Sequence, residues 1–258
     1  MDKNYALITG ASSGIGYELT KFFARDGIHL VLIARSEDKL NKLAEELKSQ
    51  YEIDVQVISE DLSNPDSVEK IYQYTKDKDL KIEYLVNNAG FGDHGLFVRT
   101  KWEKERKMID LNVTSLTYLT KLYGKDMAYR KSGKIMNLAS TASFQPGPFM
   151  NVYFATKHYV LAFSEALNKE LKKFNVSVTA LCPGPTASGF QKEANVEGSD
   201  FANNSNLPTS EEVAEYGYKK MMNGKTVAIH GLKNKLLAAS VRFMPRNVVT
   251  NITAKMMK

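Results

Sequence analysis

Seven short apolar runs alternate along this chain with longer stretches whose apolar residues recur at helical spacing. The strand-length runs lie at residues 5–9, 29–34, 55–58, 82–87, 133–138, 176–181 and 226–229, and the helix-length stretches lie at 15–26, 37–50, 64–78, 101–129, 151–174 and 209–222. Such alternation is typical of crossover units in a parallel sheet, and continuous apolar runs suit strands covered on both faces. We therefore expect an α/β fold, doubly wound, with a parallel seven-stranded sheet flanked by helices.

The length of 258 residues suits one large domain or two small ones. No linker rich in proline, glycine or serine divides the chain, so we expect one catalytic domain at 1–230 and a basic amphipathic extension at 231–258 packed on it.

The single cysteine, Cys182, excludes an internal disulfide and favours a reducing compartment. Because the first apolar run is too short for a signal-peptide core, we expect a cytoplasmic protein.

A glycine-rich turn joins the first strand to the first helix. The sequence Thr-Gly-Ala-Ser-Ser-Gly-Ile-Gly ends at Gly16. Glycines permit a sharp turn and let a pyrophosphate approach the N–H groups at the positive end of a helix. The spacing departs from Gly-x-Gly-x-x-Gly, and ordinary tight turns also use glycine, but the place in the chain favours a Rossmann-type dinucleotide site. The candidate cofactor residues here are Gly10, Ser12, Ser13, Gly14, Ile15 and Gly16.

An arginine, Arg35, follows the second strand about 20 residues beyond the turn, where an acid would bind a ribose 2′-hydroxyl. A guanidinium matches a 2′-phosphate through two hydrogen bonds, and the cofactor that this indicates is NADP(H) rather than NAD(H). The alternative is that Arg35 is a solvated residue before a helix capped by Ser36. We favour the phosphate role.

Tyr153 and Lys157 lie four residues apart at the start of a predicted helix, on one face of it. A nearby cation lowers the pKa of a phenol toward the range in which acid–base catalysis is efficient. The pattern alone is common and fits a buried aromatic residue beside a surface lysine. Ser140, however, directly follows the fifth strand, at the edge of the sheet where ligands bind.

With these residues in place, nearly the whole chain resembles the short-chain dehydrogenase/reductase family. The matching pieces, in the family's order, are residues 9–16, Asp61 and Leu62, Asn87 to Gly90, Asn112, Ser140, Tyr153, Lys157, and Pro183 with Gly184. The sequence around Arg35 and the Leu-Cys-Pro-Gly-Pro-Thr segment look like an NADP(H)-preferring branch that reduces carbonyl compounds.

The resemblance implies a role for each residue. Tyr153 is the general acid or base, Lys157 lowers its pKa and binds the nicotinamide ribose, Ser140 orients the carbonyl, and Asn112 holds a water in a proton relay. Cofactor contacts are implied for Asp61, Leu62, Asn88, Ala89, Gly90, Pro183, Gly184, Thr186 and Ser188. Ser188 stands where many relatives have threonine, so either Thr186 or Ser188 is expected to contact the carboxamide.

Aromatic residues around these motifs suggest a pocket for a lipophilic ketone or aldehyde. The candidate substrate contacts are Ser140, His94, Phe144, Phe149 and Phe190, although a lone loop histidine such as His94 is more often solvated. The four histidines show no ligand spacing with each other or with Cys182, so we predict no metal. A binding protein that senses NADP(H) without catalysis is the alternative function, and the intact acid–base set disfavours it.

A second copy of the chain is the expected macromolecular partner. Residues 159–163 are apolar nearly all round a predicted helix, and the family resemblance implies a homodimer or homotetramer. The alternative is that the loop at 185–207 covers this face within one chain.

The basic residues are concentrated at the end of the chain. The formal net charge is +6, yet from Tyr216 onward there are nine basic residues and no acidic one, so residues 1–215 are mildly acidic. No reading helix or aromatic stacking platform supports nucleic-acid binding. Apolar residues recur at helical spacing around Pro245, which suits either contact with an anionic membrane surface or closure of the pocket or a subunit interface. We favour closure.

Overall fold

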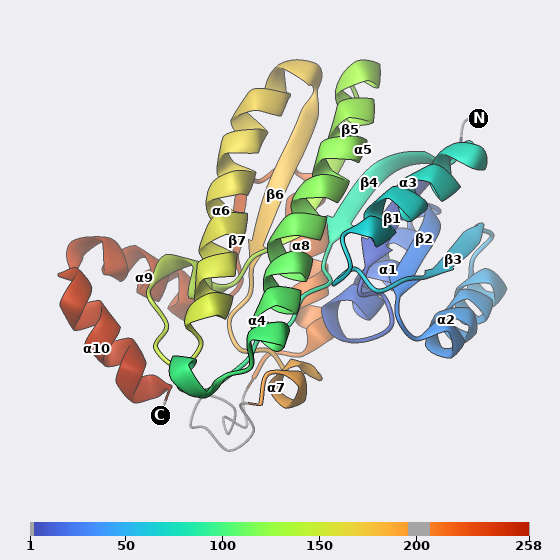
Figure 1. Cartoon of the computed structure of the whole chain (residues 1–258). Helices are drawn as coiled ribbons and strands as arrows, with labels where there is room; N and C mark the ends of the chain where they lie inside the picture. The colour runs from blue at the N-terminus through green and yellow to red at the C-terminus, as the bar shows by residue number, and fades with distance from the viewer. Residues whose placement is uncertain (1–2, 196–206, 258) are drawn as a thin grey trace.

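The seven expected strands form one parallel sheet in the computed structural model, which describes residues 3–195 and 207–257 (Figure 1). The strands are β1 Asn4–Thr9, β2 His29–Ala34, β3 Val55–Ser59, β4 Lys81–Asn87, β5 Gly133–Leu138, β6 Val176–Cys182 and β7 Val227–Ile229. Their order is β3-β2-β1-β4-β5-β6-β7, with every neighbouring pair parallel. The predicted doubly wound α/β fold is confirmed.

Most helices fall where the spacing predicts them, but the short α7 lies within the stretch 185–207 that is expected to be a loop, and one long helix is interrupted. They are α1 Gly14–Arg25, α2 Glu37–Gln50, α3 Asp66–Asp77, α4 Trp102–Ile109, α5 Leu116–Arg130, α6 Asn151–Leu171, α7 Phe190–Glu193, α8 Ser210–Met222, α9 Leu232–Ser240 and α10 Arg246–Met256. Short 3-10 turns lie at η1 Phe97–Arg99, η3 Thr141–Phe144, η4 Lys172–Phe174 and η5 Val241–Phe243. The single helix expected over 101–129 is wrong in detail, because a π-helical segment, η2 Asp110–Ser115, separates α4 from α5.

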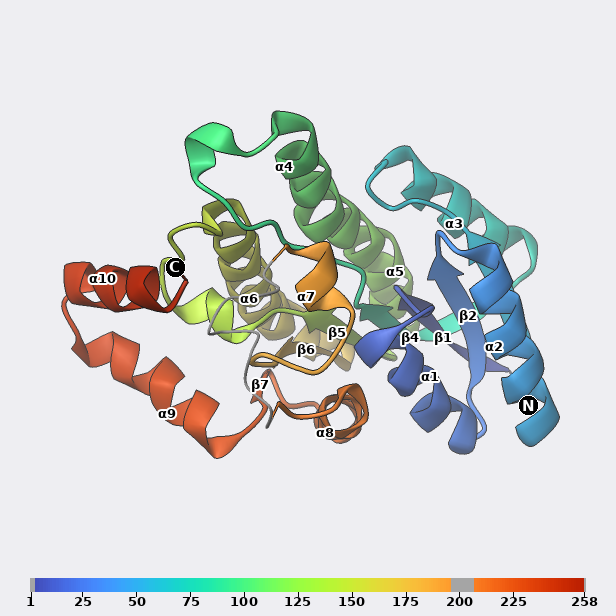
Figure 2. The ribbon, with the colours of Figure 1, turned by 90° about the horizontal axis from the view of Figure 1, so that it is seen from below.

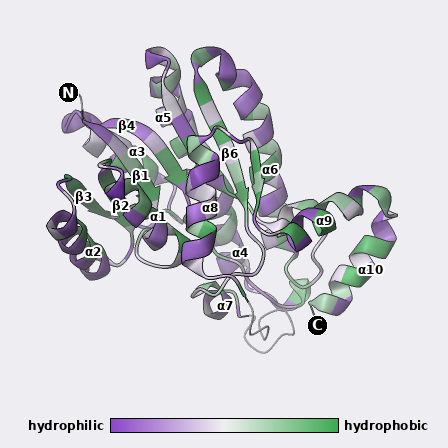
Figure 3. Ribbon diagram, turned by 180° about the vertical axis from the view of Figure 1, so that it is seen from behind, coloured by the Kyte–Doolittle hydropathy of each residue, from purple (hydrophilic) through white to green (hydrophobic). Residues whose placement is uncertain are grey.

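Helices cover both faces of the sheet because alternate side chains of a strand point to opposite faces. On β2, Leu30 and Leu32 pack with α1, α2 and α8, whereas Val31 and Ile33 pack with α3 and α5. All four are fully buried. Figure 3 shows the predominantly hydrophobic strands between helices of mixed polarity. Full burial of each such side chain contributes about 1.5 to 3 kcal/mol, which explains why this run is apolar throughout.

The last part of the described chain, α9 and α10, forms a helical hairpin at the flank of the molecule beyond β7 (Figure 2). Pro245 starts α10, which agrees with the helical spacing seen on either side of it. No helix among the described residues has the length and apolar character needed to cross a bilayer.

A buried threonine links the glycine turn after β1 to the end of β4. The Thr9 hydroxyl accepts hydrogen bonds from the backbone N–H groups of Asn88 (3.0 Å) and Ala89 (2.9 Å). In return, the Asn88 amide donates to the carbonyl oxygens of Thr9 (2.9 Å) and Gly10 (3.2 Å). The two segments that frame the centre of the carboxyl edge of the sheet are therefore held in a fixed relation.

Replacing the Thr9 hydroxyl with a methyl group tests this link. Thr9→Val keeps the shape but leaves the part-buried Ala89 N–H without its acceptor, so the free energy of unfolding should fall by about 1 to 3 kcal/mol in urea titrations. Thr9→Ser, which keeps the acceptor, should lose less. Equal stability of the valine variant and the wild type would contradict this role of the hydroxyl.

Candidate active site

A cavity of about 550 Å³ lies along the carboxyl edge of the sheet. It extends from the glycine turn and the end of β2 to α6, the segment after β6 and α10. Of the predicted cofactor residues, Gly10, Ser12, Ser13, Gly14, Ile15, Arg35, Asp61, Leu62, Asn88, Ala89, Gly90, Tyr153, Lys157, Pro183, Gly184, Thr186 and Ser188 line it. Gly16 and the predicted catalytic residue Asn112 are not part of this lining. The fold thus brings segments distant in sequence to one place.

The glycine turn presents unused backbone donors to the cavity. Gly10 and Gly14 adopt φ values of +66° and +59°, which favour glycine. Ser13, the N-cap of α1, makes no capping hydrogen bond with its side chain, and the first turn of α1 holds no acidic residue. A side chain at Gly16 would collide with the backbone of Gly10 and the Asn88 amide. The turn therefore fits an anionic group such as a pyrophosphate.

Arg35 lies at the β2 end of the cavity and is exposed. Among the residues that the structure describes, no acid forms an ion pair with its guanidinium. Asp61, at the end of β3, accepts a hydrogen bond from the Ser63 backbone N–H (2.9 Å). The free guanidinium therefore suits a phosphate at this end of the cavity.

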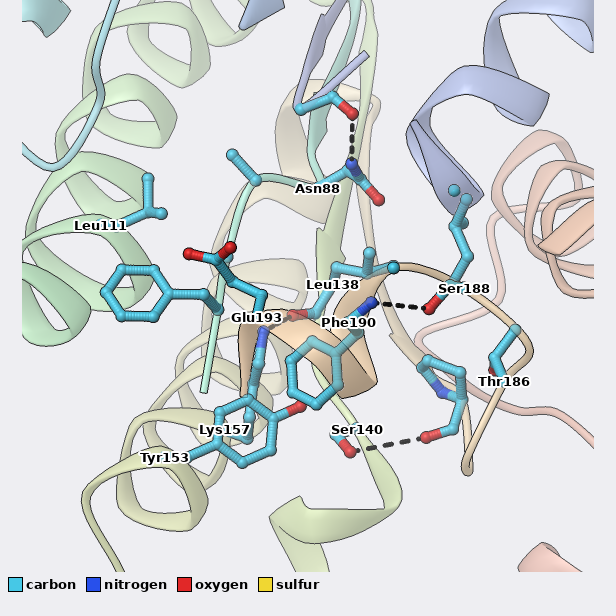
Figure 4. A pocket seen from close by; sticks show the side chains of 18 of the residues that line it. Asn88, Leu111, Leu138, Ser140, Tyr153, Lys157, Thr186, Ser188, Phe190 and Glu193 are labelled. Atoms are coloured by element: carbon cyan, nitrogen blue, oxygen red, sulfur yellow. Dashed lines mark hydrogen bonds between the residues drawn. The ribbon is translucent and has the colours of Figure 1, made fainter. Parts of the chain in front are cut away.

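Three predicted catalytic side chains lie close together at the carboxyl end of β5. Figure 4 shows the Tyr153 phenol oxygen between the Lys157 amine and the Ser140 hydroxyl. Tyr153 and Lys157 are both buried, and the Lys157 Nζ lies 5.7 Å from the centre of the Tyr153 ring. The Lys157 Nζ also donates to the Leu138 carbonyl oxygen at 2.7 Å. The first turns of α6 and the end of β5 together position this group.

Ser140 is held by the turn that it starts. Its Oγ accepts from the Ala142 N–H (3.1 Å) and donates to the Pro183 carbonyl oxygen (3.5 Å). Ser143 connects this turn to α6, because its Oγ donates to the Lys157 carbonyl oxygen at 2.7 Å. The Ser140 hydroxyl is thus fixed relative to α6 and to the end of β6.

Burial has the largest effect on the pKa values of Tyr153 and Lys157. Burial raises the pKa of Tyr153 to about 12, with a smaller lowering effect of the neighbouring Ser140 hydroxyl. Burial also lowers the pKa of Lys157 to about 8. Lys157 is not among the causes of the Tyr153 shift, and the expectation that it lowers this pKa stays a prediction. Tyr153 is therefore a protonated phenol at neutral pH and can donate a proton.

Asn112 lies in η2, where the π-helical widening of the backbone is a frequent feature of functional sites. Its amide Nδ2 donates to the Phe91 carbonyl oxygen (3.0 Å) and the Thr156 hydroxyl (3.1 Å). Its Oδ1 accepts from the Phe91 N–H at 3.2 Å. Asn112 thus anchors the segment after β4 against α6, and its part in a proton relay remains a prediction.

The candidate substrate contacts separate into two groups. Ser140 and Phe190 line the cavity, and the Phe190 ring lies 5.3 Å from that of Tyr153, centre to centre. His94, Phe144 and Phe149 are not part of the lining. His94 instead contacts the Met257 carbonyl oxygen at 2.7 Å and packs against Phe149. These two residues support the cavity wall from behind.

The structure separates the two hydroxyls after β6. Ser188 lies beside Gly14: a Cβ built at Gly14 would be 3.7 Å from the Ser188 Cβ. Thr186 is buried and donates to the Gly184 carbonyl oxygen at 3.0 Å. Ser188 therefore faces the glycine turn and Thr186 does not share that contact, and which of the two binds the carboxamide stays a prediction.

Other parts of the site escape motif-based reasoning. Thr253, Met256 and Met257 of the C-terminal hairpin line the cavity, as do Leu111 and Met150. The Leu138 carbonyl and the Ser143 hydroxyl fix Lys157. No motif could reveal a backbone acceptor, whereas the helical spacing around residue 252 did signal a packed helix.

The fold and the site are those of a dinucleotide-dependent oxidoreductase. A family model described as short chain dehydrogenase matches residues 4–198. This chain belongs to the short-chain dehydrogenase/reductase family.

Individual relatives agree with this assignment. A 7beta-hydroxysteroid dehydrogenase of Mediterraneibacter gnavus is 32% identical over 241 residues, which cover 90% of this chain and 87% of that protein. A solved short-chain dehydrogenase from Sphingobium yanoikuyae in complex with NADPH matches with a TM-score of 0.83 and 30% identity, covering 93% and 94% of the two chains. A bulky-bulky ketone specific alcohol dehydrogenase from Comamonas testosteroni has a TM-score of 0.80 and 28% identity, with 94% and 93% covered.

The buried lysine should reduce stability in a pH-dependent way. Below about pH 8 the folded chain holds a buried ammonium, whereas above the ordinary value of 10.5 the amine is neutral in both folded and unfolded chains. Lys157→Met should therefore raise the free energy of unfolding by about 1 to 3 kcal/mol near neutral pH, since part of the burial penalty is offset by the lost hydrogen bond.

This gain should shrink as the pH rises from about 8 toward 10.5. Urea titrations at several pH values measure it, with Lys169→Met, an exposed site on the same helix, as the matched control. If Lys157→Met were less stable than the wild type at every pH, the claim that burial of the ammonium destabilises the fold would be contradicted.

Proposed function

We propose that this chain is an NADP(H)-dependent oxidoreductase that reduces a ketone or aldehyde of a lipophilic small molecule, or oxidises the corresponding alcohol. The observation that carries the proposal is the buried, protonated Tyr153 phenol beside Ser140 and Lys157 at the ligand-binding edge of a doubly wound sheet. Membership of the family supports the reaction class.

The residues present fit NADP(H). The unused N–H groups at the start of α1 suit the pyrophosphate, and the unpaired Arg35 suits the 2′-phosphate. Asp61 and Leu62 would border the adenine, and Thr186 and Lys157 would hold the nicotinamide end. When bound, the reduced cofactor supplies the hydride. The solved relative from Sphingobium yanoikuyae is a complex with NADPH, which supports the same choice here.

The protein contributes the proton and the orientation. During reduction, the Tyr153 O–H donates its proton to the carbonyl oxygen while the carbonyl carbon accepts the hydride, so the product is an alcohol. The Ser140 hydroxyl donates a hydrogen bond to the same oxygen. The Lys157 ammonium stabilises the phenolate that forms, because charges interact strongly in a buried site. The reverse steps oxidise an alcohol.

Apolar side chains near Tyr153 favour a bulky lipophilic substrate. Phe154, Phe190, Met150, Met256 and Met257 line this part of the cavity. Two of the similar proteins are named for a hydroxysteroid and for bulky-bulky ketones, which agrees with this chemistry. The alternative of a non-catalytic NADP(H) sensor leaves the buried Tyr153 and Lys157 pair without a purpose.

Self-association is part of the proposal. Within 159–163, Val160 and Leu161 are buried in the chain, whereas Tyr159 and Ala162 are exposed on the outer side of α6. The Tyr159 ring stacks on Phe163 with centres 5.7 Å apart. Of the loop at 185–207, residues 196–206 lie outside the described residues. We propose that this face of α6 meets a second copy, in the cytoplasm, as a homodimer or homotetramer.

Removing the proton donor tests the reaction. Tyr153→Phe should lower kcat/KM for carbonyl reduction about 1000-fold, because general acid catalysis is lost, while NADPH binding changes little. The assay follows NADPH consumption with a panel of steroid, aromatic and aliphatic ketones and aldehydes. Tyr129→Phe, at an exposed position of α5 outside the cavity, is the control. Undiminished turnover by Tyr153→Phe would overturn the mechanism, and an inactive wild type across the panel would favour the sensor.

Reversing the charge at Arg35 tests the choice of cofactor. Arg35→Asp should weaken NADPH binding about 100-fold or more, because charge-assisted hydrogen bonds are replaced by repulsion, and should affect NADH binding far less. Fluorescence titrations with both cofactors measure the effect. Lys39→Asp, on the exposed side of α2, serves as the control. Equal losses for the two cofactors would show that Arg35 does not contact the 2′-phosphate.

A further inference from the structure

The C-terminal hairpin packs on the body through only part of its apolar surface. Val249 and Thr253 of α10 and Met257 directly after it are spaced four residues apart and are buried. The neighbouring stripe of Val248, Ile252 and Met256 has the same spacing and is exposed. In Figure 2 the hairpin stands out at the flank of the molecule, beyond β7 and α6. The tail thus contributes Thr253, Met256 and Met257 to the cavity wall, while the second stripe is left uncovered by the chain.

The other helix of the hairpin and the turn between the two add to this exposed surface. Phe243, in η5, is 88% exposed and Leu232, at the start of α9, is 72% exposed. The full set, called the apolar face below, is Leu232, Leu236, Leu237, Phe243, Val248, Ile252 and Met256. Single exposed apolar residues are ordinary, but a concentration of large ones on one projecting element marks an interaction surface.

The charges beside the apolar face all have one sign. Lys233, Lys235, Arg242, Arg246 and Lys255 are exposed, and residues 231–257 contain no acid. Within the described part of the chain, none of these five forms an ion pair. A surface that combines large apolar side chains with unpaired cations complements an anionic, partly apolar partner.

A lipid surface meets both requirements better than a second copy does. Two hairpins meeting face to face would bring their cations together without any acid between them, which is unfavourable. Anionic lipid headgroups instead attract juxtaposed Lys and Arg residues, and the boundary between headgroups and acyl chains accepts Leu and Phe side chains.

The apolar face is continuous with the cavity. Met256 belongs to the exposed stripe and also lines the cavity, and Thr253 and Met257 line it from the adjacent side of α10. The contact of 2.7 Å between His94 Nε2 and the Met257 carbonyl oxygen holds the end of α10 to the loop after β4. A surface that covers the hairpin therefore lies beside the opening of the cavity.

We propose that the α9–α10 hairpin binds the surface of an anionic lipid bilayer, with the apolar face at the level of the headgroups and acyl chains and with the five cations against lipid phosphates. The hairpin lies on the bilayer without crossing it, since α9 and α10 are short. This arrangement lets a lipophilic compound pass between the bilayer and the cavity. The binding itself does not depend on the proposed catalytic function.

Vesicle flotation with the full chain and no cofactor tests the proposal. The probes are vesicles of phosphatidylcholine alone and vesicles with about one-third phosphatidylglycerol, at low and high salt. The protein should float with the anionic vesicles at low salt, bind neutral vesicles about tenfold or more weakly, and dissociate from the anionic ones as salt rises.

Two sets of variants locate the contact. The double variant Lys233→Glu with Lys235→Glu should lower the partition coefficient about tenfold or more, and so should the triple variant Leu232→Ser, Leu236→Ser, Phe243→Ser. The controls lie at the amino ends of the strands, before β6 and β5. They are Lys172→Glu with Lys173→Glu, and Tyr129→Ser, all at exposed positions. The controls should bind as the wild type does. Because the hairpin positions are exposed, the thermal unfolding midpoints should stay unchanged.

Three results would overturn the proposal. The first is an absence of binding to anionic vesicles at low salt, and the second is an equal loss of binding in the hairpin and control variants. The third is a change of molar mass by light scattering in the triple variant without any effect on vesicle binding, which would assign the apolar face to a contact between copies.

Discussion

The site depends on the parallel direction of the strands in the sheet. Because β1, β4, β5 and β6 run the same way as neighbours, the segments after them emerge at one edge. Short hydrogen bonds then connect adjacent strand ends: Thr9 binds the segment after β4, and the Thr141 N–H donates to the Pro183 carbonyl oxygen at 2.8 Å. These bonds thereby hold the glycine turn in a fixed position relative to Tyr153, Lys157 and Ser140.

Burial of Tyr153 and Lys157 shifts their pKa values and lowers the stability of the fold. The same removal from water raises the pKa of the Tyr153 phenol and places a cation, Lys157, where it is expensive to hold. The protein retains the ammonium through one backbone acceptor, the Leu138 carbonyl. A chain selected for stability alone would place an apolar side chain there, so the buried lysine reflects function.

The sequence predicted the sheet and most of its helices from local patterns, and it predicted most of the residues that line the cavity from motifs at the strand ends and from the family resemblance. Apolar runs such as 30–33 identify covered strands, and glycine and arginine at strand ends indicate a phosphate site. It could not predict effects of three-dimensional burial: the raised pKa of Tyr153, the π-helical break at Asn112, or the exposure of Phe243. Helical spacing shows that a side of α10 is apolar, but not that only one of its two apolar stripes is covered.

The protonation state of Tyr153 is the most direct test of the central claim, that a buried neutral phenol is the proton donor. Carbon-13 NMR of the chain labelled at the ζ carbon of tyrosine, with Tyr153→Phe for assignment, reads this state from the chemical shift. The account predicts a neutral phenol at pH 7 that stays neutral beyond the ordinary tyrosine pKa of 10, toward about 12. A Tyr153 signal that is already that of a phenolate near neutral pH would contradict it.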